Sequence, residues 1–224
     1  MINFDRKNSY GFEDLCRIVE ILRAPGGCPW DMIQTHESIR RNFLEEAYEV
    51  CEAIDEQDTD HLCEELGDVM LQVVFHAGIE KDAGMFTVDD VCDGVCKKLI
   101  RRHPHVFADV QVADADEVLD NWEEIKKQER GQKDNASVLD SVARSLPALW
   151  RADKLLKKAG GFGADCWQQL DRLQASASAQ PDEKNVGDLL FAAVALARQG
   201  GVDPEDALNA ACDRFIEEYR QREN

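Results

Sequence analysis

Basic residues are scarce in this chain of 224 residues, and their scarcity excludes a broad class of functions. Only 26 Lys and Arg stand against 45 Asp and Glu, so the formal net charge is −19. A surface this acidic repels the phosphate backbone of nucleic acids, and general DNA or RNA binding is therefore excluded. A small phosphate ligand is still compatible with such a chain if a metal ion bridges the two negative partners.

Long apolar runs and paired cysteines are also absent. The most apolar run, LLFAAVALA at 189–197, is far shorter than the ~20 residues of a membrane-spanning helix. The N-terminal stretch MINFDRKNSYGF has no apolar core of a signal peptide. None of the eight cysteines forms a C-x-x-C pair. We therefore expect a cytoplasmic protein with no membrane contact, whose cysteines are small apolar side chains and not zinc or redox sites.

Residues typical of β-strands are sparse as well, since Thr, Tyr and Ile are few and helix formers dominate. The composition predicts an all-α fold, and the length allows one large domain or two small ones. The segment 24–31, with two prolines and two glycines, should break the first helix, and Thr35 or Ser38 should cap the second. Apolar periodicity predicts helices at 11–23, 38–56, 62–81, 88–103 and 116–130.

The second half of the chain partly repeats the first. ILRAPGGCPWD (21–31) resembles LLKKAGGFGAD (155–165), and LGDVMLQVVFHAG (66–78) resembles VGDLLFAAVALAR (186–198). The second copy is shorter between these landmarks and has no acidic cluster. We predict a degenerate tandem repeat, with a first repeat at 1–130, a linker at 131–137 and a second repeat at 138–224.

Two consecutive predicted helices carry acidic groups along the margins of their apolar stripes: Glu45, Glu46 and Glu49 on the first, and Glu64, Glu65 and Asp68 on the second. Residues three or four positions apart share one helix face. The short turn between these helices makes them antiparallel neighbours. Both acidic groups should therefore face the same narrow space.

Carboxylates held this close need a cation or protons to neutralise them. Oxygen-only ligands in this number suit Mg²⁺ or Mn²⁺. A solvated acidic face is the plain alternative, but helix 62–81 is apolar enough to be buried nearly all round, and a buried Asp68 would need a partner. A di-iron bundle expects Glu-x-x-His pairs, and no histidine of this chain follows a glutamate by three positions.

Together with this acidic pattern, six segments resemble, in order, those of MazG-type nucleoside triphosphate pyrophosphohydrolases, all-α relatives of the dimeric dUTPases. The segments are GGCPWD (26–31), LEEAYEV (44–50), ELGDVMLQVVF (65–75), KLIRRHPHVFAD (98–109), NWEEIKKQER (121–130) and SLPALWRADKL (145–155). The resemblance covers most of residues 12–165. It implies a four-helix-bundle-like core that is completed across a homodimer.

The resemblance also implies an activity, which is the Mg²⁺-dependent conversion of a nucleoside triphosphate to the monophosphate and pyrophosphate, with Mn²⁺ as a substitute ion. Glu45 and Glu46 would be catalytic, with one glutamate helping to activate the attacking water. The metal ligands would be Glu45, Glu46, Glu49, Glu65 and Asp68. Metal ions suit this chemistry because they screen phosphate charge and lower the pKa of water.

Substrate contacts are implied for Glu64, Lys98, Arg102, Trp122 and Lys126. The stretch KKLIRRH (97–103) stands out as the one dense basic patch in the sequence. The alternatives are surface ion pairs for the cations and a core position for Trp122. The resemblance also implies broad action on canonical or damaged (deoxy)nucleoside triphosphates.

The second repeat departs from the family pattern, since Asp188 alone remains of its acidic signature. We expect residues 138–224 to serve folding, dimerisation or regulation. A non-catalytic nucleotide-sensing or interaction protein is the rival reading. Within enzymes, a dUTPase-like or phosphoribosyl-ATP pyrophosphohydrolase of narrower specificity is the nearer alternative.

Overall fold

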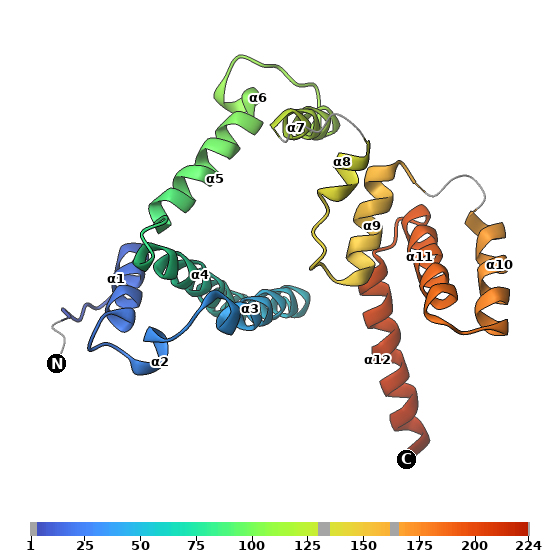
Figure 1. Cartoon of the computed structure of the whole chain (residues 1–224), viewed down its shortest axis with the longest axis horizontal. Coiled ribbons are helices and arrows are strands. Elements are labelled where there is room, and N and C mark those ends of the chain that lie inside the picture. The colour runs from blue at the N-terminus through green and yellow to red at the C-terminus, as the bar shows by residue number, and fades with distance from the viewer. Residues whose placement is uncertain (1–3, 130–134, 162–165, 224) are drawn as a thin grey trace. The chain divides into compact units, whose positions relative to one another are not determined.

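A computed structural model describes residues 4–129, 135–161 and 166–223, and Figure 1 shows their path. These residues form helices and no strand, so the all-α prediction is confirmed. The chain divides into two compact units, Met1–Ala113 and Asp114–Asn224. Among the described helices, none combines the length and the apolar character needed to cross a membrane.

The first unit contains the helices α1 Phe12–Arg23, α2 Pro29–Met32, α3 His36–Glu56, α4 Thr59–Asp82, α5 Val88–Arg102 and α6 Pro104–Phe107. The four long helices lie where the periodicity predicted them. Thr35 caps α3, since its side chain accepts from Ser38 N at 3.3 Å. Helix α4 begins earlier than predicted, because the Asp58 carboxylate accepts from the backbone N–H groups of its first turn.

The turn after α1 depends on its two glycines. Gly26 has φ of +86°, a left-handed conformation that favours glycine. A Cβ on Gly27 would lie 2.2 Å from the carbonyl oxygen of Ile21 and 2.5 Å from that of Leu22. No side chain fits at Gly27, so the chain can fold back this tightly only with glycine there.

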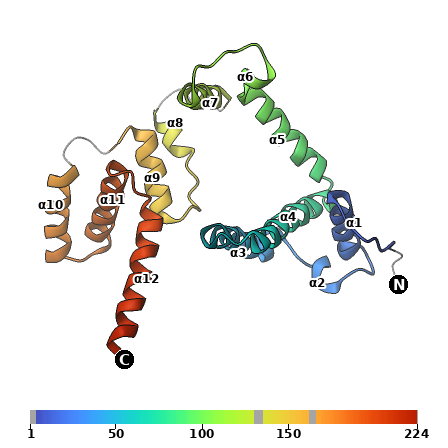
Figure 2. The same cartoon turned by 180° about the vertical axis from the view of Figure 1, so that it is seen from behind.

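Helices α3 and α4 lie side by side and antiparallel, as Figures 1 and 2 show from opposite sides. Gln57, in the left-handed region with φ of 57°, ends α3 and turns the chain toward α4. The core of the unit consists of Val19 from α1, Ile39 from α3, and Val74 and Phe75 from α4. The packing places the N-terminal half of α4 against the C-terminal half of α3.

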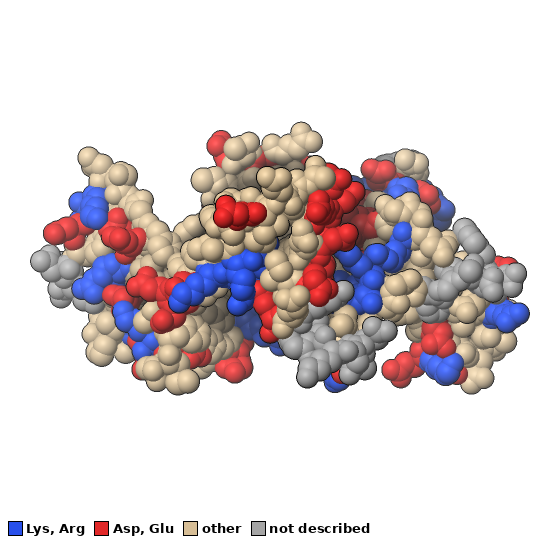
Figure 3. All heavy atoms as spheres, turned by 90° about the horizontal axis from the view of Figure 1, so that it is seen from above, with Lys and Arg blue, Asp and Glu red and all other residues tan. Residues whose placement is uncertain are grey.

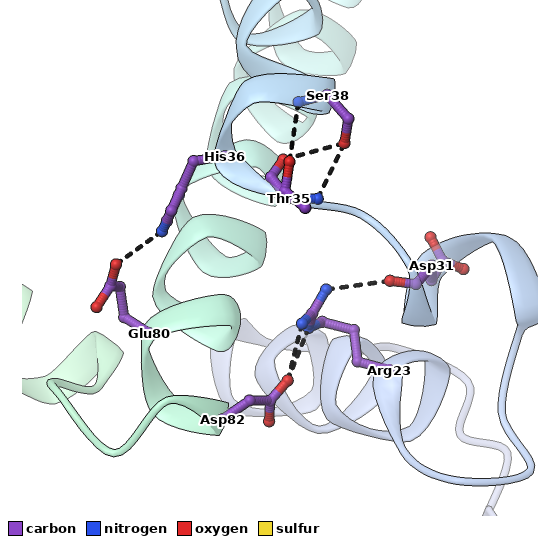
Figure 4. A network of polar contacts seen from close by, with 7 residues as sticks. All are labelled: Arg23, Asp31, Thr35, His36, Ser38, Glu80 and Asp82. Atoms are coloured by element: carbon purple, nitrogen blue, oxygen red, sulfur yellow. Dashed lines mark hydrogen bonds and ion pairs between the residues drawn. The ribbon is translucent and has the colours of Figure 1, made fainter.

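Polar contacts at the opposite end of this helix pair fix its position against α1 (Figure 4). The buried Arg23 side chain forms an ion pair with Asp82 at 2.8 Å and donates to the carbonyl oxygen of Asp31 at 3.0 Å. On α3, His36 Nε2 lies 2.7 Å from Glu80 Oε1. These contacts join α1, α3 and α4 into one scaffold.

The prediction that α4 is buried nearly all round is wrong for the single chain. Leu66 and Met70 are 49% and 44% exposed, because α1 and α3 cover only part of the helix surface. Helix α5 is more open still, and its apolar Val95 and Leu99 are exposed. Cys51, Cys63, Cys92, Cys96 and Cys212 are free and exposed, and the absence of a zinc or redox role for the cysteines stays a prediction.

The second unit contains α7 Ala115–Glu129, α8 Asn135–Asp140, α9 Ala148–Ala159, α10 Cys166–Ala179, α11 Glu183–Gln199 and α12 Pro204–Glu223. Ala152 and Leu156 of α9 pack against Val194 and Ala195 of α11 to form its core. The predicted linker 131–137 lies largely outside the described residues, and α8 takes its last three positions. The tandem repeat and its boundaries stay predictions.

Candidate metal centre

Three glutamates meet where α3 and α4 run antiparallel. Glu46 and Glu49 are one helix turn apart on α3, and Glu65 faces them from α4. Each offers a carboxylate oxygen, and these oxygens all lie within 4.8 Å of one another. We call this group the acidic cluster. The spacing in the sequence thus produces the convergence that the pattern predicted.

The carboxylate of Glu65 is the most deeply placed member of the cluster, with the residue only 8% exposed. Its Oε1 lies 3.2 Å from His61 Nε2. Its Oε2 is buried and has no hydrogen-bond partner among the described residues. A buried carboxylate oxygen without a donor is a costly arrangement, and it favours a site that binds a cation or a proton.

The raised pKa values of two carboxyl groups in the cluster also favour a cation site. Burial raises the pKa of Glu46, and the charges of Asp68, Glu49 and Glu65 raise it further. Burial also raises the pKa of Glu65, helped by Glu49 and opposed by His61. The carboxylates therefore repel one another, and a hard divalent cation with oxygen ligands fits the set.

The other predicted acidic residues lie around the cluster at different depths. Asp68 is half-buried one turn after Glu65, and its charge raises the pKa of both Glu46 and Glu65. Glu64 is exposed. Glu45 is also exposed and pairs with Arg41 Nε at 3.2 Å, so the structure does not bring it into the cluster. The predicted roles of these residues stay predictions.

The predicted substrate-binding cations belong to two different units. Lys98 and Arg102 are one turn apart on α5, with Lys98 exposed and Arg102 half-buried. Trp122 and Lys126 lie on α7 of the second unit, where Lys126 Nζ is 5.7 Å from the centre of the Trp122 ring. The contact to the ring confirms the i, i+4 pairing of these two side chains, while their contact with substrate stays a prediction.

One residue of the site escaped the sequence analysis. His61 contacts the buried glutamate from one turn earlier on α4. Its signal was present in the sequence, because His61 and Glu65 are four positions apart and so share a helix face. It was missed because the predicted helix began only at residue 62.

Comparison with known proteins agrees with this geometry. Residues 34–107 match the MazG nucleotide pyrophosphohydrolase domain. The Thermotoga maritima protein named nucleoside triphosphate pyrophosphohydrolase/pyrophosphatase MazG is 43% identical over 223 residues, which cover 95% of this chain and 85% of that protein. The chain belongs to the MazG family.

Two further relatives extend the comparison. The nucleoside triphosphate pyrophosphohydrolase of Escherichia coli K12 is 43% identical over 225 residues, 93% of this chain and 86% of that protein. YabN of Bacillus subtilis is 48% identical over 218 residues, 91% of this chain. This chain spans only 44% of the length of YabN. The matched MazG domain includes the whole acidic cluster together with Lys98 and Arg102, and it ends before α7.

Proposed function

We propose that this MazG-family chain is a Mg²⁺-dependent nucleoside triphosphate pyrophosphohydrolase. It would convert (deoxy)nucleoside triphosphates to the monophosphate and pyrophosphate. The observation that carries the proposal is the buried oxygen of Glu65 in the acidic cluster, which has no hydrogen-bond partner in the described part of the chain. The names of the Thermotoga and E. coli relatives, both nucleoside triphosphate pyrophosphohydrolases, support the same activity.

In this proposal Glu46, Glu49, Glu65 and Asp68 hold the metal, and Mn²⁺ can replace Mg²⁺ because both ions prefer oxygen ligands. When bound, the ion screens the phosphate charge and lowers the pKa of water. Glu45 is the weaker candidate ligand, because its carboxylate already pairs with Arg41. His61 holds Glu65 in place through its Nε2.

The reaction requires a water oxygen to attack the α-phosphorus. A new P–O bond forms, the bond from the α-phosphorus to the α–β bridging oxygen breaks, and pyrophosphate leaves with that oxygen. A carboxylate must accept the proton of the attacking water. Glu46 is the candidate for this role, because it lies in the acidic cluster beside Glu49 and Glu65.

The remaining predicted residues would bind substrate. Lys98 and Arg102, on one face of α5, are suited to the β- and γ-phosphates. Trp122 offers a ring for base stacking, and Lys126 beside it offers a further cation. Glu64, which precedes Glu65 on α4 and is exposed, would accept a hydrogen bond from a ribose hydroxyl.

A homodimer is part of this proposal. The exposed apolar side chains of α4 and α5 form faces that α1 and α3 leave uncovered, and two antiparallel long helices make up only half of a four-helix core. A second copy packed on these faces would bury them. A cytoplasmic location is likewise proposed from the sequence alone.

Product analysis tests the function. Purified protein, Mg²⁺ and each common (deoxy)nucleoside triphosphate should give monophosphate and pyrophosphate. Glu46→Gln and Asp68→Asn should both abolish turnover. Diphosphate with orthophosphate as products would contradict the assigned bond. Nucleotide binding without turnover in folded protein would favour a nucleotide sensor.

A further inference from the structure

A cavity of about 460 Å³ lies in the first unit, where α1, the C-terminal half of α4 and the first turn of α5 meet (Figures 1 and 2). Its volume is in the range of small-molecule pockets. The cavity has an apolar floor, because the buried side chains of Val19, Val74 and Ala77 line it. Phe12 from α1 and Val88 from α5 extend this apolar lining. We call the cavity the α1–α4 pocket.

The α1–α4 pocket is separate from the acidic cluster. The residues of α4 that line it begin at Val74, nine positions after Glu65 and therefore about 14 Å further along the helix. None of the residues that line it was predicted to bind metal or substrate. The proposed hydrolysis therefore assigns no role to this cavity.

Carboxylates without a cationic partner remain at the rim of this pocket. Acidic and basic side chains gather at separate places on the surface drawn in Figure 3, so the charge of a cavity depends on its own residues. Both cations that line the pocket, Arg17 and Lys81, pair with Glu20, and the distance from Arg17 is 3.2 Å. Glu13 and Asp89 also line it, and both are exposed and form no ion pair within the described part of the chain. The negative charge of these two carboxylates is therefore available to a ligand.

The thiol of Cys16, which also lines the pocket, shows the sign of the electric field there. Burial raises the pKa of this thiol, and the charges of Glu20 and Asp89 raise it further. Negative charges nearby raise the pKa of a thiol because they disfavour the thiolate. The carboxylates therefore dominate the field at this wall, and the same field stabilises a cation that enters the pocket.

We propose that the α1–α4 pocket binds an organic amine, whose apolar body covers the floor and whose ammonium group lies at the rim with Glu13 and Asp89. An ammonium group has three donors, and its hydrogen bonds to carboxylates are stronger than those between neutral groups. The floor contributes to binding in proportion to the apolar area that the ligand removes from water. A carboxylic acid of the same shape would be repelled by the rim carboxylates, so the pocket distinguishes ligands by their charge.

NMR titration of the ¹⁵N-labelled full chain in EDTA tests this proposal, with phenethylamine as the probe. Hydrocinnamate replaces the ammonium group by a carboxylate, and methylamine keeps the charge without the aromatic body. Phenethylamine should bind at least about tenfold more tightly than either of them. The amide shifts that it changes should lie in α1, in the C-terminal half of α4 and in the first turn of α5. Nucleotide and divalent metal are absent, so the result does not depend on whether the proposed hydrolysis is correct.

Variants with opposite effects on the charge of the pocket sharpen the test. The double variant Glu13→Gln, Asp89→Asn should weaken the binding of phenethylamine by about tenfold. Arg17→Gln removes a cation from the pocket and should tighten binding by a few fold, which a misfolded variant cannot do. Asp93→Asn is the matched control on α5, because Asp93 does not line the pocket and pairs with Lys97 at 2.6 Å. This control should leave binding unchanged.

The dissociation constants and the position of the shift changes decide the outcome. Hydrocinnamate or methylamine binding as tightly as phenethylamine would overturn the proposal, because neither has both the charge and the apolar body. Equal binding of phenethylamine by the wild type and the double variant would also overturn it. Shift changes centred on Glu46 and Glu65 would place the amine in the acidic cluster and contradict the assignment to the α1–α4 pocket.

Discussion

Neutralising one carboxylate of the acidic cluster should stabilise the metal-free protein and remove its response to metal. Oxygens of Glu46, Glu49 and Glu65 lie within 4.8 Å of one another. Two unit charges at that separation repel by about 1 kcal/mol in water and by about 3–4 kcal/mol at an effective dielectric constant of about 20. Glu49 is exposed, so solvent screening favours the lower figure.

We therefore expect Glu46→Gln to raise the stability of the metal-free protein by about 1 kcal/mol, or about 2–4 °C in Tm for a chain of this size. Wild type should gain about 2.7 kcal/mol from Mg²⁺ at about one hundred times its Kd. The variant should gain little, because one ligand of the ion is missing. Thermal unfolding in EDTA and in Mg²⁺ measures both effects.

Two matched variants sharpen this prediction. Glu52→Gln makes the same charge change at an exposed position of α3 outside the cluster. It should change neither the stability of the metal-free protein nor the stability gained from Mg²⁺. Glu45→Gln breaks the ion pair with Arg41 and should not stabilise the metal-free protein. The reasoning is refuted if metal-free Glu46→Gln is less stable than wild type and still gains stability from Mg²⁺. If Glu45→Gln instead stabilises the metal-free protein and removes the gain from Mg²⁺, Glu45 and not Glu46 belongs to the cluster.

Three further predictions concern the scaffold. Gly27→Ala should lower the free energy of unfolding, measured in urea, by at least about 2 kcal/mol, because its Cβ would overlap backbone oxygens. Gly94→Ala is the control: Gly94 lies within α5 in open space, so this change should leave stability unchanged or raise it. Burial, and then the charge of His36, lowers the pKa of His76, so the folded state binds fewer protons than the unfolded state. The free energy of unfolding should therefore fall as the pH drops below about 6.5. His76→Gln should make this fall smaller, and a pH profile of stability that is the same in the variant would contradict the reasoning. Met70→Glu should shift the protein toward monomer in sedimentation velocity if the exposed face of α4 is a dimer interface, and an unchanged dimer would place the interface elsewhere.

Sequence reasoning succeeded where the determining interactions are local. The cap at Thr35 and the convergence of Glu46, Glu49 and Glu65 follow from helix spacing and a short antiparallel turn. The order of six short segments also identified the MazG family, which the comparisons confirm. The cap and the convergence need only the order of residues within one helix or across one turn.

Features that depend on tertiary packing were not predictable in this way. Spacing alone cannot tell which of the adjacent Glu45 and Glu46 joins the cluster. In the structure Glu46 does so, whereas Glu45 is exposed and pairs with Arg41. Burial was expected at Asp68, whereas Glu65 is the buried carboxylate. The apolar composition of α4 indicated burial that one chain does not provide.

Isotope transfer from water tests the central claim most directly, because it shows which phosphorus is attacked. Hydrolysis in ¹⁸O-labelled water with Mg²⁺, followed by mass spectrometry of both products, locates the new P–O bond. The account predicts one ¹⁸O atom in the nucleoside monophosphate and unlabelled pyrophosphate. Label in the pyrophosphate, with an unlabelled monophosphate, would place the attack at the β-phosphorus and contradict the account.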